Sequence, residues 1–340
     1  MPKIRVLVVD DSCVAREIIS SILTTDQDIE IVGEAVNGME AVEKATMLKP
    51  DIVTMDIEMP IMNGLLAIEQ IMSSSQACPI LVISSTDNAQ TSFEAIEKGA
   101  LELIPKSELD FDNPAPFIKK VKNLARVKVI AHVKFQRRKS LRPPLPPFTN
   151  GKQCPFEIIA IASSTGGPFA LSRIISKLRP EFPLPIVIAQ HIVEGFALGL
   201  AEWLQGMTKL VVKIGEEGEV IKAGTIYISP PERNMIVSNA RRISLVAQKN
   251  TAIYHPSCNS LLSSVADVYG SKCLGTILTG MGDDGVEGAG KIREAGGKVF
   301  AQDEKTSVVF GMPKVAIERG FVDQVLPLEG LVEKFIELHS

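Results

Sequence analysis

The feature that most constrains this chain is a regular alternation between short apolar runs and stretches of helical periodicity. The runs have the length of strands, and the stretches between them place apolar residues three and four positions apart. Strands that alternate with helices need crossover connections, so the pattern predicts parallel sheets with helices on both faces. In the first part of the chain we expect strands at 4–9, 29–32, 52–55, 80–83 and 101–104, with helices after residue 12, around 38–48, 64–74 and 89–98, and from about residue 116.

This order is a (βα)₅ unit, the flavodoxin-like arrangement of α/β folds. The second part of the chain has the same α/β pattern, but its sequence is not a repeat of the first part. Residues 210–246 carry turn residues and short β patterns. We therefore predict a second, doubly wound α/β domain with a small β insertion. Its strands are expected at 157–162, 186–189, 225–228, 274–278 and 298–301, and its helices from about 168, near 196–205, at 258–269, from about 284 and at 328–339.

The charge distribution divides the chain in the same way. A length of 340 residues suggests about two domains. Residues 1–114 carry 7 Lys and Arg against 20 Asp and Glu, residues 115–152 carry 11 basic and no acidic residues, and residues 153–340 carry 18 against 20. Four of residues 143–147 are proline, which no helix can cross. We predict a first domain at 1–122, a basic, proline-rich linker at 123–152 and a second domain at 153–340.

Composition excludes several classes of protein. The basic segment has no aromatic stacking platform, so we interpret it as a linker and expect no nucleic-acid partner. No apolar run reaches the roughly 18–20 residues of a membrane span, and residues 1–12 lack the pattern of a signal peptide. We expect a cytoplasmic protein without membrane insertion. Five dispersed cysteines without a C-x-x-C pair, and four scattered histidines, indicate neither a disulfide framework nor a metal-ligand cluster.

Polar residues follow each strand of the first unit. Asp10 and Asp11 follow the first strand, Asp56 the third, Ser84 the fourth and Lys106 the fifth. In the strand order 2-1-3-4-5 the first and third strands are neighbours, so three carboxylates converge at one edge of the sheet. Such convergence is unfavourable without a cation, and oxygen ligands of this kind suit Mg²⁺. The set predicts a site for a phosphoryl group carried on a carboxylate.

The segments VLVVDDS, DIVTMDIEMPIMNG, LVISST and GALELIPKS make residues 1–122 resemble a response-regulator receiver domain. The resemblance implies that Asp56 is the phospho-acceptor and that Asp10 and Asp11 help it to hold Mg²⁺. It also implies that Ser84 switches onto the phosphoryl group and that Lys106 pairs with it.

A second set of polar residues follows three strands of the second unit. IIAIASSTGGP places Ser163 and Ser164 between a strand and a helix, where a hydroxyl lies near the positive end of the helix dipole. The alternatives are a plain helix cap and a phosphate-binding loop, but G-x-G-x-x-G and the P-loop lysine are both absent. A nucleophilic serine needs a base. His191 ends the next strand and is a better candidate than His255, which lies in a polar stretch.

An orienting carboxylate is available in ILTGMGDDG, where a Gly-Met-Gly turn carries Asp283 and Asp284. The same turn offers backbone N–H donors for an oxyanion hole, although a tight-turn or phosphate-binding loop would have a similar sequence. Serine, histidine and aspartate on three strand ends together favour acyl transfer.

The segments ASSTGG, AQHIVEGF, ILTGMGDDG and VVFGMP make residues 155–330 resemble the catalytic domain of chemotaxis protein-glutamate methylesterases, the CheB family. The resemblance implies that Ser164 is the nucleophile, His191 the base and Asp284 the residue that orients the histidine. The backbone of Met281 is the expected oxyanion donor. Four residues depart from patterns common in the two families: Leu103, Ser107, Asn259 and Asp283.

Together the resemblances imply a phosphorylation-activated serine esterase. Its expected substrates are glutamate γ-methyl esters, and also glutamines, on methyl-accepting chemotaxis receptors, and its expected activator is a chemotaxis histidine kinase. Mg²⁺ is expected for the receiver and no cofactor for the esterase. The alternative is a response regulator whose second domain binds a partner without catalysis. A transcription regulator is disfavoured because the second domain has a net charge of only −2.

Overall fold

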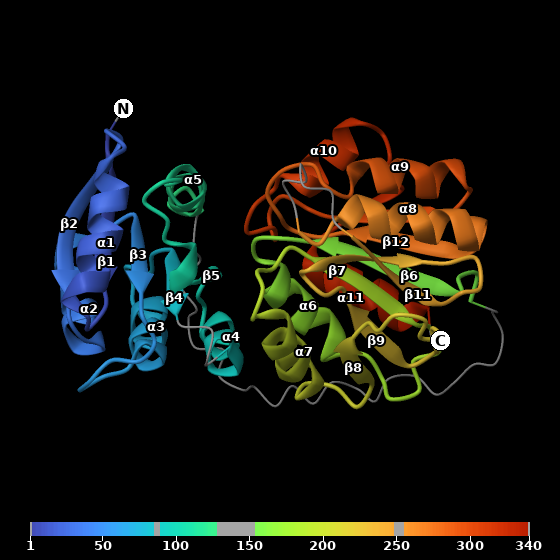
Figure 1. Cartoon of the computed structure of the whole chain (residues 1–340), viewed down its shortest axis with the longest axis horizontal. Coiled ribbons are helices and arrows are strands. Elements are labelled where there is room, and N and C mark those ends of the chain that lie inside the picture. Colours follow the sequence, from blue (N-terminus) through green and yellow to red (C-terminus); the bar gives the residue numbers. More distant parts are fainter. Residues whose placement is uncertain (1, 85–88, 128–153, 248–254, 339–340) are drawn as a thin grey trace. The chain divides into compact units, whose positions relative to one another are not determined.

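The computed structural model describes residues 2–84, 89–127, 154–247 and 255–338. The chain forms two compact units that divide between Pro146 and Pro147, outside the described residues, and each unit is described by itself (Figure 1). Most of the predicted linker lies outside the described residues, and α5 of the first unit extends to Leu124. Among the described residues, no helix combines the length and apolar character needed to cross a membrane.

The first unit is a five-stranded parallel sheet in the order β2-β1-β3-β4-β5, as predicted. Side chains cap the N-termini of three of its helices: Ser12 accepts from the Ala15 N–H, and Asn37 and Asn63 each accept from the N–H three residues on. The strands are β1 (Ile4–Val9), β2 (Ile29–Ala35), β3 (Ile52–Met55), β4 (Ile80–Ser84) and β5 (Glu102–Pro105), and the helices are α1 (Cys13–Thr24), α2 (Gly38–Leu48), α3 (Gly64–Ser73), α4 (Ala89–Glu97) and α5 (Ala115–Leu124), with a 3₁₀ turn η2 (Lys106–Glu108).

The second unit has a seven-stranded sheet in the order β14-β13-β12-β6-β7-β9-β8, in which every neighbouring pair is parallel. A separate antiparallel pair, β10 and β11, forms the small β insertion. The strands are β6 (Ile158–Ser163), β7 (Ile186–Gln190), β8 (Val211–Ile214), β9 (Thr225–Ile228), β10 (Arg233–Val237), β11 (Ile243–Ala247), β12 (Cys273–Ile277), β13 (Lys298–Gln302) and β14 (Gln324–Leu326), and the helices are α6 (Gly167–Ile175), α7 (Ala197–Gln205), α8 (Cys258–Tyr269), α9 (Val286–Glu294), α10 (Met312–Glu318) and α11 (Leu328–Glu337), with a 3₁₀ turn η3 (Gly270–Lys272).

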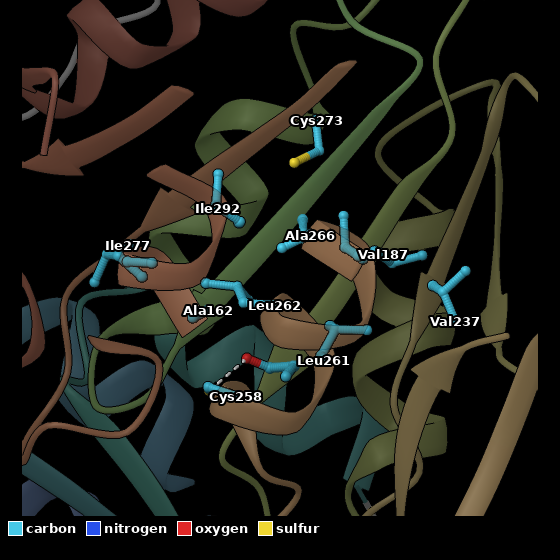
Figure 2. Packing of buried hydrophobic residues seen from close by; sticks show 14 of the residues in the cluster. Ala162, Val187, Val237, Cys258, Leu261, Leu262, Ala266, Cys273, Ile277 and Ile292 are labelled. Carbon is cyan, nitrogen blue, oxygen red and sulfur yellow. Dashed lines mark hydrogen bonds between the residues drawn. The ribbon is translucent and has the colours of Figure 1, made fainter. Parts of the chain in front are cut away.

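Helices cover both faces of this sheet, so the doubly wound class is confirmed. In Figure 1, α8, α9 and α10 lie above the sheet, and α6, α7 and α11 lie below it. In the hydrophobic core between α8 and the sheet, apolar side chains of the helices pack against those of the central strands (Figure 2). Ala162 and Val187 contribute from the strands, Leu262 and Ala266 from α8 and Ile292 from α9. This packing fixes the start of α8 against the ends of β6, β7 and β12.

Three local features differ from the prediction. β8 and β9 join the main sheet as parallel strands, so only β10 and β11 form the insertion. The short elements α10 and β14 were not predicted, because seven and three residues are too few for a clear periodicity. The helix after β12 begins at Val286 instead of near 284, since Gly285 adopts a left-handed φ of 98° that a helix cannot include.

Candidate functional site

In the first unit, the strand ends bring together the predicted acidic cluster and its lysine. Asp10, Asp11 and Asp56 can each contribute one carboxylate oxygen to a group whose members all lie within 4.8 Å of one another. The Nζ atom of Lys106 lies 2.8 Å from Oδ2 of Asp10 and 3.2 Å from Oδ2 of Asp56. Ser84 is buried at the end of β4, at the same edge of the sheet.

Charge compensation in this cluster is incomplete. Burial of Asp56, followed by the charge of Asp10, raises the pKa of its carboxyl to about 6, although Lys106 opposes the shift. Burial alone would lower the pKa of Lys106, but its hydrogen bonds and ion pairs with the two aspartates raise it. One lysine therefore serves two buried carboxylates. A divalent cation with a preference for oxygen ligands fits this donor set, and Asp10, Asp11 and Asp56 are the residues that would hold it.

In the second unit, the polar residues gather where the direction of strand addition reverses. From β6 the chain adds β7 and then β9 on one side, and later β12 and then β13 on the other. Ligand sites of open α/β sheets lie at the carboxyl end of such a switch point. Ser164 follows β6, His191 follows β7 and Asp284 lies in the turn beyond β12. Residues that lie far apart in the sequence therefore meet at one edge of the sheet.

The two neighbouring serines differ in exposure. Ser163 is fully buried, and its hydroxyl donates a hydrogen bond of 2.7 Å to Oε1 of Gln190. Ser164 is half-buried and lies in the turn between β6 and α6. A hydroxyl that is buried and already donates to an amide is poorly placed to meet a substrate. The arrangement favours Ser164 as the reactive hydroxyl and gives Ser163 a structural role.

Gln190 links the serine turn to the histidine turn. Its Nε2 atom donates to the backbone carbonyls of Ser164 and His191, each at 2.9 Å. The backbone N–H of His191 donates in turn to the carbonyl of Ser163 at 2.9 Å. Gln190 is itself buried, so these bonds form where water does not compete. The backbones of the serine turn and the histidine turn are thereby held in a fixed register.

His191 and Asp284 form a close side-chain pair at the site. The Nε2 atom of His191 lies 2.8 Å from Oδ2 of Asp284, and the carboxylate also accepts the N–H of Cys258 at 2.6 Å and that of Asn259 at 2.9 Å. The hydroxyl of Ser257 donates to the same carboxylate at 3.4 Å. The carboxylate thus lies at the N-terminus of α8, where backbone donors and the helix dipole favour negative charge.

These contacts keep Asp284 ionised. Burial alone would raise the pKa of Asp284, but the hydrogen bond and charge of His191 and the N–H groups of Asn259 and Cys258 outweigh it, so the pKa lies below its ordinary value. An ionised carboxylate only accepts hydrogen bonds. The proton between the two side chains therefore resides on Nε2 of His191, and Nδ1 is the ring nitrogen that carries the basic lone pair. Asp283 is exposed and His255 lies at the surface.

The turn after β12 runs beside the serine. The N–H of Ser164 donates to the carbonyl of Thr279 at 3.1 Å. A Cβ atom on Gly280 would lie 2.7 Å from Cβ of Ser164 and 2.4 Å from the sulfur of Met312, so this close approach requires glycine. Met281 is the next residue. Its role as oxyanion donor stays a prediction.

Several residues of the site were not predicted. Gln190, Ser257 and Cys258 were not predicted as site residues, and Asn259 was predicted only as a departure from the family pattern. Ser257 did carry a signal, since it precedes a helical pattern and caps α8 by accepting the N–H of Ser260. The scattered histidines and cysteines gave no indication that the fold brings His191, Cys258 and Asp284 together. Their separation in the sequence concealed the group.

Comparisons with known proteins identify the families to which the two units belong. The family model for CheB methylesterase matches residues 159–335, and that for the response regulator receiver domain matches residues 6–112. Protein-glutamate methylesterase/protein-glutamine glutaminase 3 of Paramagnetospirillum magneticum is 44% identical over 342 residues, covering 99% of this chain and 96% of the relative. The corresponding protein of Thermotoga maritima is 40% identical over 344 residues, covering 98% of both chains. The crystal structure of the Thermotoga maritima CheB methylesterase catalytic domain superposes with a TM-score of 0.52 at 42% identity, covering 54% of this chain and 98% of that one.

The raised pKa of Asp56 predicts that the free energy of unfolding of the first unit depends on pH. A protonated Asp56 stabilises the fold below about pH 4, and this contribution is lost as the pH rises through about 6. We expect Asp56→Asn to raise the free energy of unfolding of the first unit by about 1–3 kcal/mol at pH 7.5 without divalent cations, and by much less at pH 4.5. Asp11→Asn, which alters an exposed carboxylate of the same cluster, should stabilise less.

Hydrogen exchange of the β1 and β3 amides during urea unfolding measures this effect. Trp203, the sole tryptophan, lies in the second unit, so tryptophan fluorescence does not report on the first. An equal gain in the free energy of unfolding for Asp56→Asn at both pH values would contradict the prediction.

Proposed function

The chain belongs to the CheB methylesterase family and carries a response regulator receiver domain, and from this premise we propose that it is a phosphorylation-regulated protein-glutamate methylesterase and protein-glutamine glutaminase. Its substrates would be glutamate γ-methyl esters and glutamines of methyl-accepting chemotaxis receptors. The observation that carries the proposal is the Asp284–His191 pair at the same sheet edge as Ser164, where β6, β7 and β12 end. The non-catalytic alternative is not favoured, since the relatives are named as enzymes over nearly the whole chain.

The chemistry follows from the protonation of His191. Because Nε2 donates to Asp284, Nδ1 accepts the proton as Oγ of Ser164 attacks the ester carbonyl. The same proton then passes to the leaving group, which departs as methanol from an ester or as ammonia from a glutamine. Water, deprotonated by Nδ1, hydrolyses the acyl-enzyme and restores Ser164. Asp284 stabilises the imidazolium that forms in each step.

The receiver domain would regulate this reaction through Asp56. We propose that a chemotaxis histidine kinase transfers a phosphoryl group to its carboxylate. Mg²⁺, when held by Asp10, Asp11 and Asp56, supplies positive charge that offsets the charge of the phosphoryl group. Lys106 would pair with one phosphoryl oxygen, and Ser84 would donate a hydrogen bond to another. The five cysteines all carry free thiols, which supports a reducing, cytoplasmic location.

Two neighbouring serines provide a matched test of the nucleophile. Ser164→Ala should lower the rate of methanol release from methylated receptor membranes by at least about a thousandfold, since it removes the attacking oxygen. Ser163→Ala should keep most of the activity but lose about 1–3 kcal/mol of stability, because Oε1 of Gln190 loses a buried donor. Loss of activity in the Ser163 variant alone would refute the assignment.

Two neighbouring aspartates test the orienting role in the same assay. Asp284→Asn should lower kcat by several orders of magnitude, because an amide no longer holds the proton of His191 on Nε2. Asp283→Asn changes an exposed side chain and should remain close to the wild-type rate. Similar kinetics for both variants would contradict the proposed orienting role of Asp284.

Phosphorylation should raise the esterase rate of the full-length protein. With acetyl phosphate and Mg²⁺ we expect an activation of about 5- to 150-fold, the range of ordinary allosteric couplings. Asp56→Asn should not respond, and excess chelator should abolish the response of the wild type. Equal activation of the Asp56 variant would mean that the acceptor lies elsewhere.

A further inference from the structure

A free cysteine lies beside the catalytic pair. Cys258, the first residue of α8, is completely buried, and its sulfur lies 3.5 Å from Nε2 of His191. Nε2 is the same atom that lies 2.8 Å from Oδ2 of Asp284. One nitrogen, one sulfur and one oxygen, from three different segments, therefore all lie within 4.8 Å of one another. The reaction proposed above does not use the thiol.

The spacing of these atoms resembles the ligand spacing of zinc. A tetrahedral zinc ion with Zn–S and Zn–N bonds of about 2.3 and 2.0 Å separates its sulfur and nitrogen ligands by about 3.5 Å, and its nitrogen and oxygen ligands by about 3.3 Å. The sulfur–nitrogen separation already has this value, and the nitrogen–oxygen separation needs to widen by only about half an ångström. Cysteine, histidine and aspartate are all ordinary zinc ligands.

Burial and the charge of Asp284 raise the pKa of the Cys258 thiol well above its ordinary value, so a metal ion has to displace the thiol proton, whereas the other contacts favour coordination. The thiol of Cys258 donates to the carbonyl of Ala189 at 3.3 Å, which leaves sulfur lone pairs for other directions. Asp284 is ionised and is held in place through Oδ1 by the N–H of Asn259. The side chain of His191 is 12% exposed, whereas that of Asp284 is 4% exposed, so a metal ion would reach the group past the imidazole.

We propose that His191, Cys258 and Asp284 form an inhibitory zinc site within the esterase centre, with water as the fourth ligand. On binding, the thiol releases its proton to solvent, and a thiolate and a carboxylate neutralise the two charges of the ion. Nε2 of His191 gives up its proton to bind the metal, and the neutral imidazole then carries its proton on Nδ1. That nitrogen can no longer accept the proton of Ser164. The inhibitory consequence rests on the proposed function, whereas the metal site itself does not.

Cobalt tests the site without reference to catalysis. We would titrate full-length protein with Co²⁺ in excess Mg²⁺, which occupies the carboxylates of the first unit, and record thiolate-to-cobalt charge-transfer absorption. One equivalent of Co²⁺ should produce the band in the wild type and in Cys273→Val, a matched variant of another buried free cysteine. Cys258→Val and His191→Gln should lack it. Absence of the band in the wild type, or its persistence in Cys258→Val, would overturn the site.

Zinc inhibition and diffraction complete the test. Zn²⁺ should inhibit methanol release reversibly, and Cys258→Val should need at least about tenfold more Zn²⁺ for half-inhibition relative to its own metal-free rate. An anomalous map at the zinc edge, from wild-type crystals, should place one peak among the three ligand atoms whatever the folding of the variants. A peak elsewhere would refute the proposal. A correct peak in a protein without esterase activity would refute the proposed function instead.

Discussion

The burial of carboxylates at the ends of parallel strands is the constraint on which both units depend. A buried carboxylate is strongly unfavourable unless cations or N–H donors surround it. Asp284 is fully compensated by His191 and by two N–H groups at the start of α8, and its pKa is low. Asp56 shares Lys106 with Asp10, and its pKa rises to about 6. Two carboxylates at the ends of parallel strands therefore differ: the charge of Asp284 is compensated, and the charge of Asp56 is compensated only in part.

This difference in charge compensation suits phosphorylation in the first unit and catalysis in the second. An incompletely compensated cluster responds strongly when a cation and a phosphoryl group arrive, because their charges interact differently with alternative arrangements of Lys106 and Ser84. A catalytic centre needs the opposite property, namely donors and acceptors that are fixed before the substrate binds. Gln190 serves that need, since it holds the carbonyls of Ser164 and His191 from a buried position.

The sequence predicted the elements, and the strand ends at which the candidate residues lie, better than it predicted the neighbours of those residues. Strand-length apolar runs identified β1, β3 and β9 to the residue, and strand ends identified where Asp56, Ser164 and His191 would lie. Periodicity could not assign β8 to the main sheet, because pairing with β9 depends on contacts between distant residues. Cys258 and Gln190 were missed for a related reason. Cys258 is 67 residues from His191, and the hydrogen bonds of Gln190 exist only once β6 and β7 are paired.

The features that would make His191 an effective base would also allow it to bind a metal ion. Orientation by Asp284 requires an ionised carboxylate close to the imidazole, and the same ionised carboxylate attracts a cation. A serine esterase ordinarily escapes this conflict, because one imidazole and one carboxylate offer only two ligands. Cys258 supplies the third ligand, at the helix end whose N–H groups hold Asp284. Since the backbone of residue 258 is needed to hold the carboxylate and its side chain is not, metal sensitivity can vary without loss of the esterase.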